Sequence, residues 1–271
     1  MPRHKSITEI VRNPNQEDSR KIARLWEMAR KVIDQAQHGS SAFEEKQRRI
    51  NTLLEYLGHS QLASVLVLDA ACGCGSLLFV GETDTRTWYF SDGDNVMVKT
   101  VVEKCADSFL ISRIKQAYWH EIPGVFEAVN FDVVFILGNS LPYIVNWSDD
   151  KSEAEITAEG FAALKHSFSA ILQACPKGHF VFDLHRNHTQ MSGKTEFEGR
   201  VLHPFINAVH RDGIRYWVVG TEEEQYLIKG LALDIDTIRG LLLDVGYKKI
   251  EQIPEQFELD PFYYSMFAAS R

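Results

Sequence analysis

The sequence has no long apolar run and no N-terminal targeting segment. Its apolar stretches fall short of the roughly 18 consecutive residues that a helix needs to span a bilayer. The N-terminal segment MPRHKSITEIVRN lacks the apolar core of a secretory signal. We therefore expect a cytoplasmic protein with reduced thiols and without a membrane partner.

Basic residues are in the minority. The chain has 29 Lys and Arg residues against 37 Asp and Glu residues, which gives a formal net charge of −8. Nucleic-acid binding depends on clustered Lys and Arg side chains that neutralise phosphates. The pair Arg48-Arg49 is too small for such a patch, so no nucleic-acid partner is expected. The composition leaves room for a homo-oligomer.

Cysteine is scarce, with four residues in 271: Cys72, Cys74, Cys105 and Cys175. The Cys72-x-Cys74 spacing is shorter than the C-x₂₋₄-C of common zinc sites, and no second pair follows downstream. We interpret both residues as small side chains in a tight loop. No metal site is expected.

The most informative stretch is VLVLDAACGCGS, residues 65–76. A short apolar run ends in Asp69 and then breaks into small residues around Gly73 and Gly75, a turn that lets a ligand approach the backbone. A second apolar run, residues 88–92, also ends in an acid, Asp92. This succession of a strand, a glycine turn, a second strand and an acid predicts an adenosine-type ligand. Asp92 is expected to bind the ribose of that ligand.

Apolar segments alternate with helical ones through most of the chain. Strands are predicted at 64–69, 87–91, 109–115, 131–137, 179–184, 247–250 and 262–267. Helices are predicted at 94–106, 158–174 and 234–244, the last beginning at Asp234 or Asp236 and ending at Gly246. The predicted fold class is α/β: a Rossmann-like, seven-stranded, mostly parallel sheet with an antiparallel C-terminal hairpin.

Two segments lie outside this alternation. Residues 1–60 contain two predicted amphipathic helices, 16–37 and 42–57, which we interpret as an N-terminal helical lid carrying Trp26. Residues 189–232 alternate apolar and polar positions and predict a small antiparallel β insert that forms part of an acceptor site. Residues 1–271 are expected to form a single domain.

This ordered set resembles the class I S-adenosylmethionine-dependent methyltransferases, and within them the glycine N-methyltransferase-like small-molecule enzymes. The likeness rests on LDAACGCG, SDGDNVM, AYW, LGNSLPYI and DLHRN, and it covers about 64–188 and 234–271. Two positions depart from the family pattern: Tyr118 stands where Asn is usual, and Leu184 intervenes between Asp183 and His185. The resemblance implies S-adenosyl-L-methionine as the cofactor and a small molecule as the methyl acceptor.

The resemblance also implies roles for single residues. The expected cofactor-binding residues are Asp69, Ala71, Gly73, Gly75, Asp92, Gly93, Asn95, Tyr118, Trp119 and Leu137. Asn139 would lie at the transferring methyl group and contact the acceptor, and Arg186 would pair with an acceptor carboxylate. Trp26 is a further candidate for acceptor binding. His185 and Tyr143 are candidate catalytic bases.

Several functions remain open at this point. N-methylation of an amine or amino-acid-like metabolite leads. O- or C-methylation of a specialised metabolite or keto acid, and cofactor binding without catalysis, are the alternatives. A nicotinamide oxidoreductase is disfavoured because Leu78 occupies the place of the third glycine in G-x-G-x-x-G.

Overall fold

The structure is a computed structural model. It describes residues 20–21, 24, 42–78, 87–145, 150–186, 195–197, 200–202, 206–211, 213–220, 225–261 and 264–271. The chain divides into two compact units. The larger unit comprises 43–144, 159–186 and 233–271, and the smaller unit comprises 1–42, 145–158 and 187–232. Trp26 and most of the predicted helix 16–37 lie outside the described residues.

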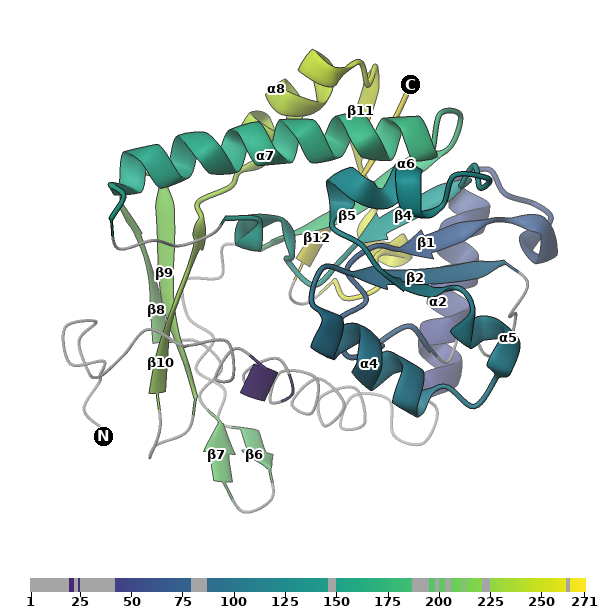
Figure 1. The fold of residues 1–271 in the computed structure, drawn as a ribbon, viewed down its shortest axis with the longest axis horizontal. Coiled ribbons are helices and arrows are strands. Elements are labelled where there is room, and N and C mark those ends of the chain that lie inside the picture. Colours follow the sequence, from purple (N-terminus) through teal and green to yellow (C-terminus); the bar gives the residue numbers. More distant parts are fainter. Residues whose placement is uncertain are drawn as a thin grey trace. The chain divides into compact units, whose positions relative to one another are not determined.

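The larger unit is built on a seven-stranded sheet with the strand order β11-β12-β5-β4-β1-β2-β3 (Figure 1). The strands are β1 (Val67–Asp69), β2 (Trp88–Asp92), β3 (Ile114–Gln116), β4 (Val133–Ile136), β5 (His179–His185), β11 (Lys249–Gln252) and β12 (Tyr264–Ser270). The first five strands run parallel, whereas β12 is antiparallel to β5 and to β11. The predicted mostly parallel sheet with an antiparallel C-terminal hairpin is confirmed.

Buried side chains explain why β1 and β4 are central. All residues of both strands are buried, as expected for strands covered on both faces. Trp88 and Phe135 stack across the core with ring centroids 6.2 Å apart. Strand order reverses at β1, which lies between β2 and β4, and ligands of open α/β sheets bind at such a switch point.

Six helices accompany these strands in the part of the chain that the structure describes. They are α2 (Ala42–Tyr56), α4 (Asn95–Lys104), α5 (Ser108–Ile111), α6 (Ile122–Val125), α7 (Glu153–Ala174) and α8 (Ile235–Val245). The predicted end signals of α8 are confirmed: Asp234 Oδ1 accepts a hydrogen bond from Thr237 N, and Gly246 adopts φ +107°. No helix among these residues is long and apolar enough to cross a membrane.

The predicted strand at 109–115 is wrong over its first half. Asp107 Oδ1 accepts hydrogen bonds from Phe109 N and Leu110 N at 2.8 and 2.9 Å. This N-cap satisfies the free N–H groups of a helix start, so residues 108–111 form the short helix α5. The strand begins only at Ile114.

The smaller unit contains the predicted antiparallel insert. Its strands are β6 (Thr195–Phe197), β7 (Arg200–Leu202), β8 (Ile206–Arg211), β9 (Ile214–Gly220) and β10 (Gln225–Leu231). β6 pairs with β7, and β9 pairs with both β8 and β10, all antiparallel. Gly213 at φ +81° opens β9, and the Tyr216 hydroxyl donates a hydrogen bond to Glu153 at the start of α7. The roles of this insert in acceptor binding and of 1–60 as a lid stay predictions.

Candidate cofactor and acceptor site

The turn after β1 contains two glycines with different tasks. Gly73 has φ +52°, and a Cβ added there would meet no atom within 4 Å. Gly75 has φ +86°, but an added Cβ would lie 3.3 Å from side-chain atoms of Leu78 and Val101. Gly73 therefore keeps open space beside the backbone, whereas Gly75 allows the turn to pack against α4.

Asp92, the last residue of β2, ties this turn to the next one. Its Oδ2 accepts a hydrogen bond from Gly73 N and its Oδ1 accepts one from Asp94 N, both at 2.9 Å. Burial raises the pKa of Asp92, and the two backbone donors counteract part of that rise. An ionised carboxylate offers about four acceptor positions, so roughly two remain for a ligand's hydroxyl groups.

The residues after β3 close in on the same edge of the sheet. Trp119 donates a hydrogen bond from Nε1 to the carbonyl oxygen of Ala70 at 2.9 Å. The ring of Tyr118 covers Gly93, where an added Cβ would lie 2.7 Å from Cδ1 of that ring. Tyr118 itself is 55% exposed, and its ring stacks on that of His120 with centroids 5.9 Å apart. Tyr118 and Trp119, both predicted to bind the cofactor, therefore contact the turns after β2 and β1, respectively.

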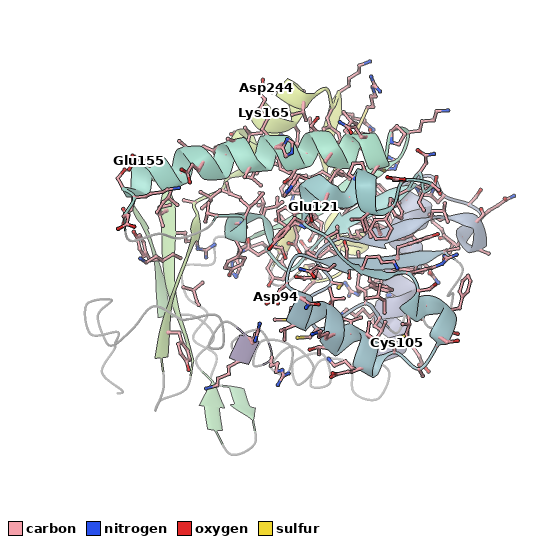
Figure 2. The ribbon with its side chains drawn as sticks, viewed as in Figure 1. Asp94, Cys105, Glu121, Glu155, Lys165 and Asp244 are labelled. Carbon is pink, nitrogen blue, oxygen red and sulfur yellow. The ribbon has the colours of Figure 1, made fainter. Side chains whose placement is uncertain are left out.

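The start of α4 has a structural role in addition to the predicted one. Asp94 caps the helix by accepting a hydrogen bond from Val96 N at 2.8 Å (Figure 2). Asn95, the first helical residue, is exposed. Gln116 at the end of β3 donates to Gly93 O at 3.2 Å, which links the two strand ends.

The turn after β4 is held by a residue of β5. Asp183 is 3% exposed, and its carboxylate accepts hydrogen bonds from Gly138 N at 2.8 Å and Asn139 N at 2.6 Å. Gly138 has φ +75°, and Asn139, with φ +57°, is the single non-glycine residue at positive φ among those that the structure describes. Such backbone conformations are costly and gather at functional sites.

Asn139 also contacts the end of β5 directly. Its Oδ1 accepts a hydrogen bond from His185 N at 3.4 Å. The Nδ1 of His185 lies 2.7 Å from Arg186 O, and a carbonyl only accepts, so Nδ1 carries a proton. In the neutral ring Nε2 is then the basic nitrogen. Two of the predicted catalytic residues, Asn139 and His185, are thus brought together.

The remaining predicted residues are placed as follows. Asp69 is 2% exposed at the end of β1, and Ala71 follows it in the turn. The carbonyl of Leu137 accepts a hydrogen bond from the Ser140 hydroxyl at 2.6 Å. Tyr143 is 46% exposed in the short 3-10 helix Leu141–Tyr143.

Arg186 is bound by other residues of the chain. It donates from Nε to Tyr264 O at 3.1 Å and pairs with Glu258 at 2.5 Å. A second carboxylate, that of Glu255, lies 3.6 Å from its Nη1. Its expected pairing with an acceptor carboxylate stays a prediction, as does acceptor binding by Trp26.

Comparison with known proteins finds similarity at the level of the fold. No protein-family model matches the sequence, and no curated protein matches it. Solved structures do match. The sugar N-methyltransferase KedS8 from a Streptoalloteichus species is 16% identical with a TM-score of 0.54, and the match covers 84% of this chain and 85% of that one.

Two further structures agree. DesVI of Streptomyces venezuelae is 11% identical with a TM-score of 0.58, over 96% of this chain and 99% of that one. CalS10, an amino pentose methyltransferase from Micromonospora echinaspora solved with bound S-adenosylmethionine, is 13% identical with a TM-score of 0.53, over 84% and 96%. The chain has the class I methyltransferase fold.

Within this methyltransferase fold, sequence reasoning missed two acids that hold the site together, Asp183 and Glu258. Asp183 interrupts the apolar run of β5, and an acid inside a buried strand is a signal for a hydrogen-bonded role. Glu258 lies 72 residues after its partner Arg186 in a segment without a recognisable motif. No local pattern points to it.

Proposed function

We propose that this protein transfers a methyl group from S-adenosyl-L-methionine to a small-molecule amine. The observation that carries the proposal is the Asp92 carboxylate, which joins Gly73 N and Asp94 N at the switch point of the sheet. Its unused lone pairs suit the two hydroxyls of a ribose, and the open space at Gly73 suits a ligand close to the backbone. The methyltransferase fold supports the same assignment.

The residues that would hold the cofactor surround this carboxylate. Tyr118 and Trp119 border the adenine, and Ala71 and Gly73 lie along the methionine part. Asp69, Gly75, Gly93, Asn95 and the backbone of Leu137 complete the proposed set. When bound, the cofactor supplies a methyl group activated by a positively charged sulfur.

The chain's own contribution to transfer is positioning and proton removal. Asn139 is held at its strained φ by Asp183, so it can present its side chain to an acceptor in a fixed direction. The basic Nε2 of His185 can take the proton that an ammonium group must lose before it becomes a nucleophile. Tyr143 is the second candidate base. N-methylation is favoured by the sugar N-methyltransferase among the matching structures.

We also propose a reducing, cytoplasmic location. All four cysteines are buried, and none forms a disulfide. Burial raises the pKa of the Cys175 thiol to about 12, which keeps it protonated and unreactive.

Calorimetry on Asp92→Asn tests the cofactor assignment. Titration with S-adenosylhomocysteine should show binding to the natural protein and at least about tenfold weaker binding to the variant, a loss of about 1.4 kcal/mol. Asp107→Asn is the matched control, because Asp107 also accepts two backbone N–H groups but caps α5. Equal affinities in all three proteins would remove Asp92 from the site.

A label-transfer screen tests the reaction. Methyl-labelled cofactor is incubated with panels of amines, phenols and keto acids, and each product is analysed for the labelled atom. Label on nitrogen supports the proposal. Label on oxygen or carbon would reassign the acceptor atom, and tight cofactor binding without transfer to any panel member would favour a binding protein without catalysis.

A further inference from the structure

Arg186 lies at the edge of the sheet where the proposed acceptor residues gather. It directly follows His185, whose backbone N–H donates to Asn139 Oδ1. A guanidinium there would suit an acceptor carboxylate if its donors were available. In the structure all three of its nitrogens have partners: Tyr264 O, Glu258 and Glu255.

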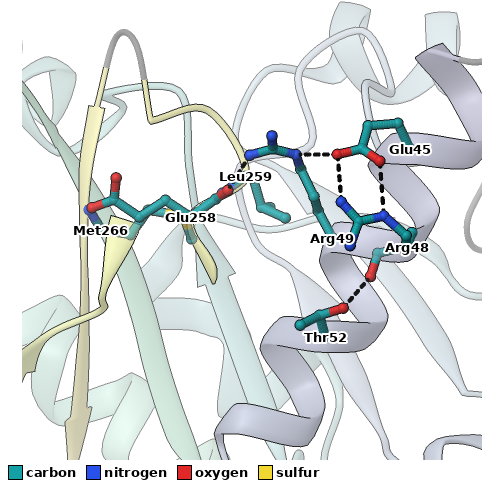
Figure 3. Close-up of polar contacts among 7 residues, drawn as sticks. All are labelled: Glu45, Arg48, Arg49, Thr52, Glu258, Leu259 and Met266. Carbon is teal, nitrogen blue, oxygen red and sulfur yellow. Dashed lines mark hydrogen bonds and ion pairs between the residues drawn. The ribbon is translucent and has the colours of Figure 1, made fainter. Parts of the chain in front are cut away.

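Glu258 is an unusually well-held partner. Its side chain is fully buried, and its Oε1 accepts a hydrogen bond from Met266 N at 3.0 Å while Oε2 binds Arg186. Its backbone carbonyl accepts a hydrogen bond from Arg49 of α2 at 3.0 Å (Figure 3). Arg49 is itself paired with Glu45 at 2.7 Å. Contacts from α2 and β12 therefore hold Glu258 in place beside Arg186.

The charges around Arg186 do not favour an anion. A fully buried carboxylate at 2.5 Å and an exposed one at 3.6 Å face a single guanidinium, which leaves a net charge of about −1. An acceptor carboxylate that approached this guanidinium would be repelled by both carboxylates. Displacing Glu258 would also leave a buried charge without its partner, which is strongly unfavourable.

We propose that Glu258 is a specificity-determining residue that withholds Arg186 from the acceptor, so that the acceptor is an amine recognised without a carboxylate. This inference rests on the proposed methyl transfer and deepens it. Arg186 is then a positioning residue: it fixes the end of β5, and through His185 the side chain of Asn139, by its contacts with Glu258 and Tyr264.

The contact between Arg186 and Glu258 can be tested without any substrate. Phenylglyoxal reacts with accessible guanidinium groups, and peptide mass spectrometry gives the rate at each arginine. In the natural protein Arg186 should react at least about tenfold more slowly than the exposed C-terminal Arg271. Glu258→Gln, which keeps the shape but removes the charge, should accelerate modification of Arg186 about tenfold. The control Glu255→Gln should change it less than about twofold.

Acceptor choice is measured with matched pairs. Each amino acid is compared with its own carboxamide as the acceptor for labelled methyl groups. The natural protein should have a kcat/KM for the carboxamide at least about tenfold higher than for the acid, chiefly through KM. Glu258→Gln should reduce this ratio, and Glu255→Gln, which removes a more distant and solvent-exposed carboxylate, should reduce it less.

The outcomes separate this inference from the proposed function. Equal reactivity of Arg186 and Arg271 in the natural protein, or a preference for the acids, overturns the role of Glu258 while methyl transfer stands. Both measurements use the natural protein, so they decide the matter even if Glu258→Gln does not fold. Absence of cofactor binding in the calorimeter instead overturns the methyl transfer, and the phenylglyoxal rates then still decide whether Glu258 engages Arg186.

Discussion

Asp183 accepts a hydrogen bond from the backbone N–H of Asn139 at 2.6 Å, and Asn139 has φ +57°. A second bond, from Gly138 N at 2.8 Å, reaches the other carboxylate oxygen. The pattern matches the one at Asp92, whose two oxygens take Gly73 N and Asp94 N. Asp183 thus fixes two backbone N–H groups of one turn, whereas Asp92 joins the turns after β1 and β2.

Asp183→Asn should weaken this arrangement. The amide can accept a hydrogen bond from only one of the two backbone donors, and its NH₂ group faces the other. We therefore expect the free energy of unfolding to fall by about 2–3 kcal/mol. Urea titration followed by circular dichroism measures the change. In the control Asp132→Asn the amide oxygen can still accept the single hydrogen bond from Leu66 N, which is 2.9 Å long, so stability should fall by less than about 1 kcal/mol. Equal losses would show that the paired bonds to Asp183 add nothing.

Substitutions at Asn139 separate its backbone from its side chain. Asn139→Gly adopts positive φ freely, so it should lose only the hydrogen bond to His185 N, about 1 kcal/mol, whereas Asn139→Ala should lose about 1–2 kcal/mol more. Both variants lack the oxygen that binds His185 N. Methyl transfer should therefore fall in both, while urea unfolding distinguishes them. Full activity in Asn139→Gly would remove the side chain from the proposed acceptor site.

Replacing each of the two glycines after β1 by alanine should affect stability and cofactor affinity to different extents. In Gly75→Ala the new methyl group meets Leu78 and Val101 at 3.3 Å, so stability falls and the melting temperature drops. In Gly73→Ala the methyl group enters open space, so stability falls only by the cost of positive φ, about 1–2 kcal/mol. S-adenosylhomocysteine affinity should fall more in Gly73→Ala, as calorimetry would show. A larger affinity loss in Gly75→Ala would reverse the assignment.

Cofactor affinity should decline at mildly acidic pH. Burial raises the pKa of Asp92 above its usual value of about 3.8, so this carboxylate protonates earlier than an exposed one as pH falls. Ribose hydroxyls donate to the ionised form, and affinity should fall about tenfold per pH unit below that raised pKa. Titrations of S-adenosylhomocysteine between about pH 7 and pH 4 measure it. Asp92→Asn should show a flatter profile.

The raised pKa of Asp92 has the opposite effect on the stability of the folded protein. A pKa raised by folding means that protonated Asp92 favours the folded state. Its stabilising contribution is complete below the unfolded pKa and is lost as pH rises through the folded value. At the acid end of the same pH range, protonation of Asp92 should therefore stabilise the folded protein against urea and weaken cofactor binding at the same time.

Local sequence patterns determined the strands, most helices and the part of the site around Gly73 and Asp92. Apolar runs marked the buried strands, Asp234 and Gly246 marked the ends of α8, and Gly73 with Asp92 marked the switch point. These signals are readable because they depend on residues close in sequence, through caps, turns and continuous burial. The strand predicted at 109–115 was partly wrong because the N-cap Asp107 outweighed the strand propensity of an apolar run.

Only the tertiary structure decided the partners of the charged residues. Asp183 meets Asn139 across 44 positions, and Arg186 meets Glu258 across 72. The first pair is set by strand order, since the neighbouring strands β4 and β5 bring distant residues together, and the second joins the residue after β5 to the residue after the 3-10 helix Glu255–Phe257. A carboxylate in a buried strand must find a donor, but which donor it finds depends on the packing of the whole sheet.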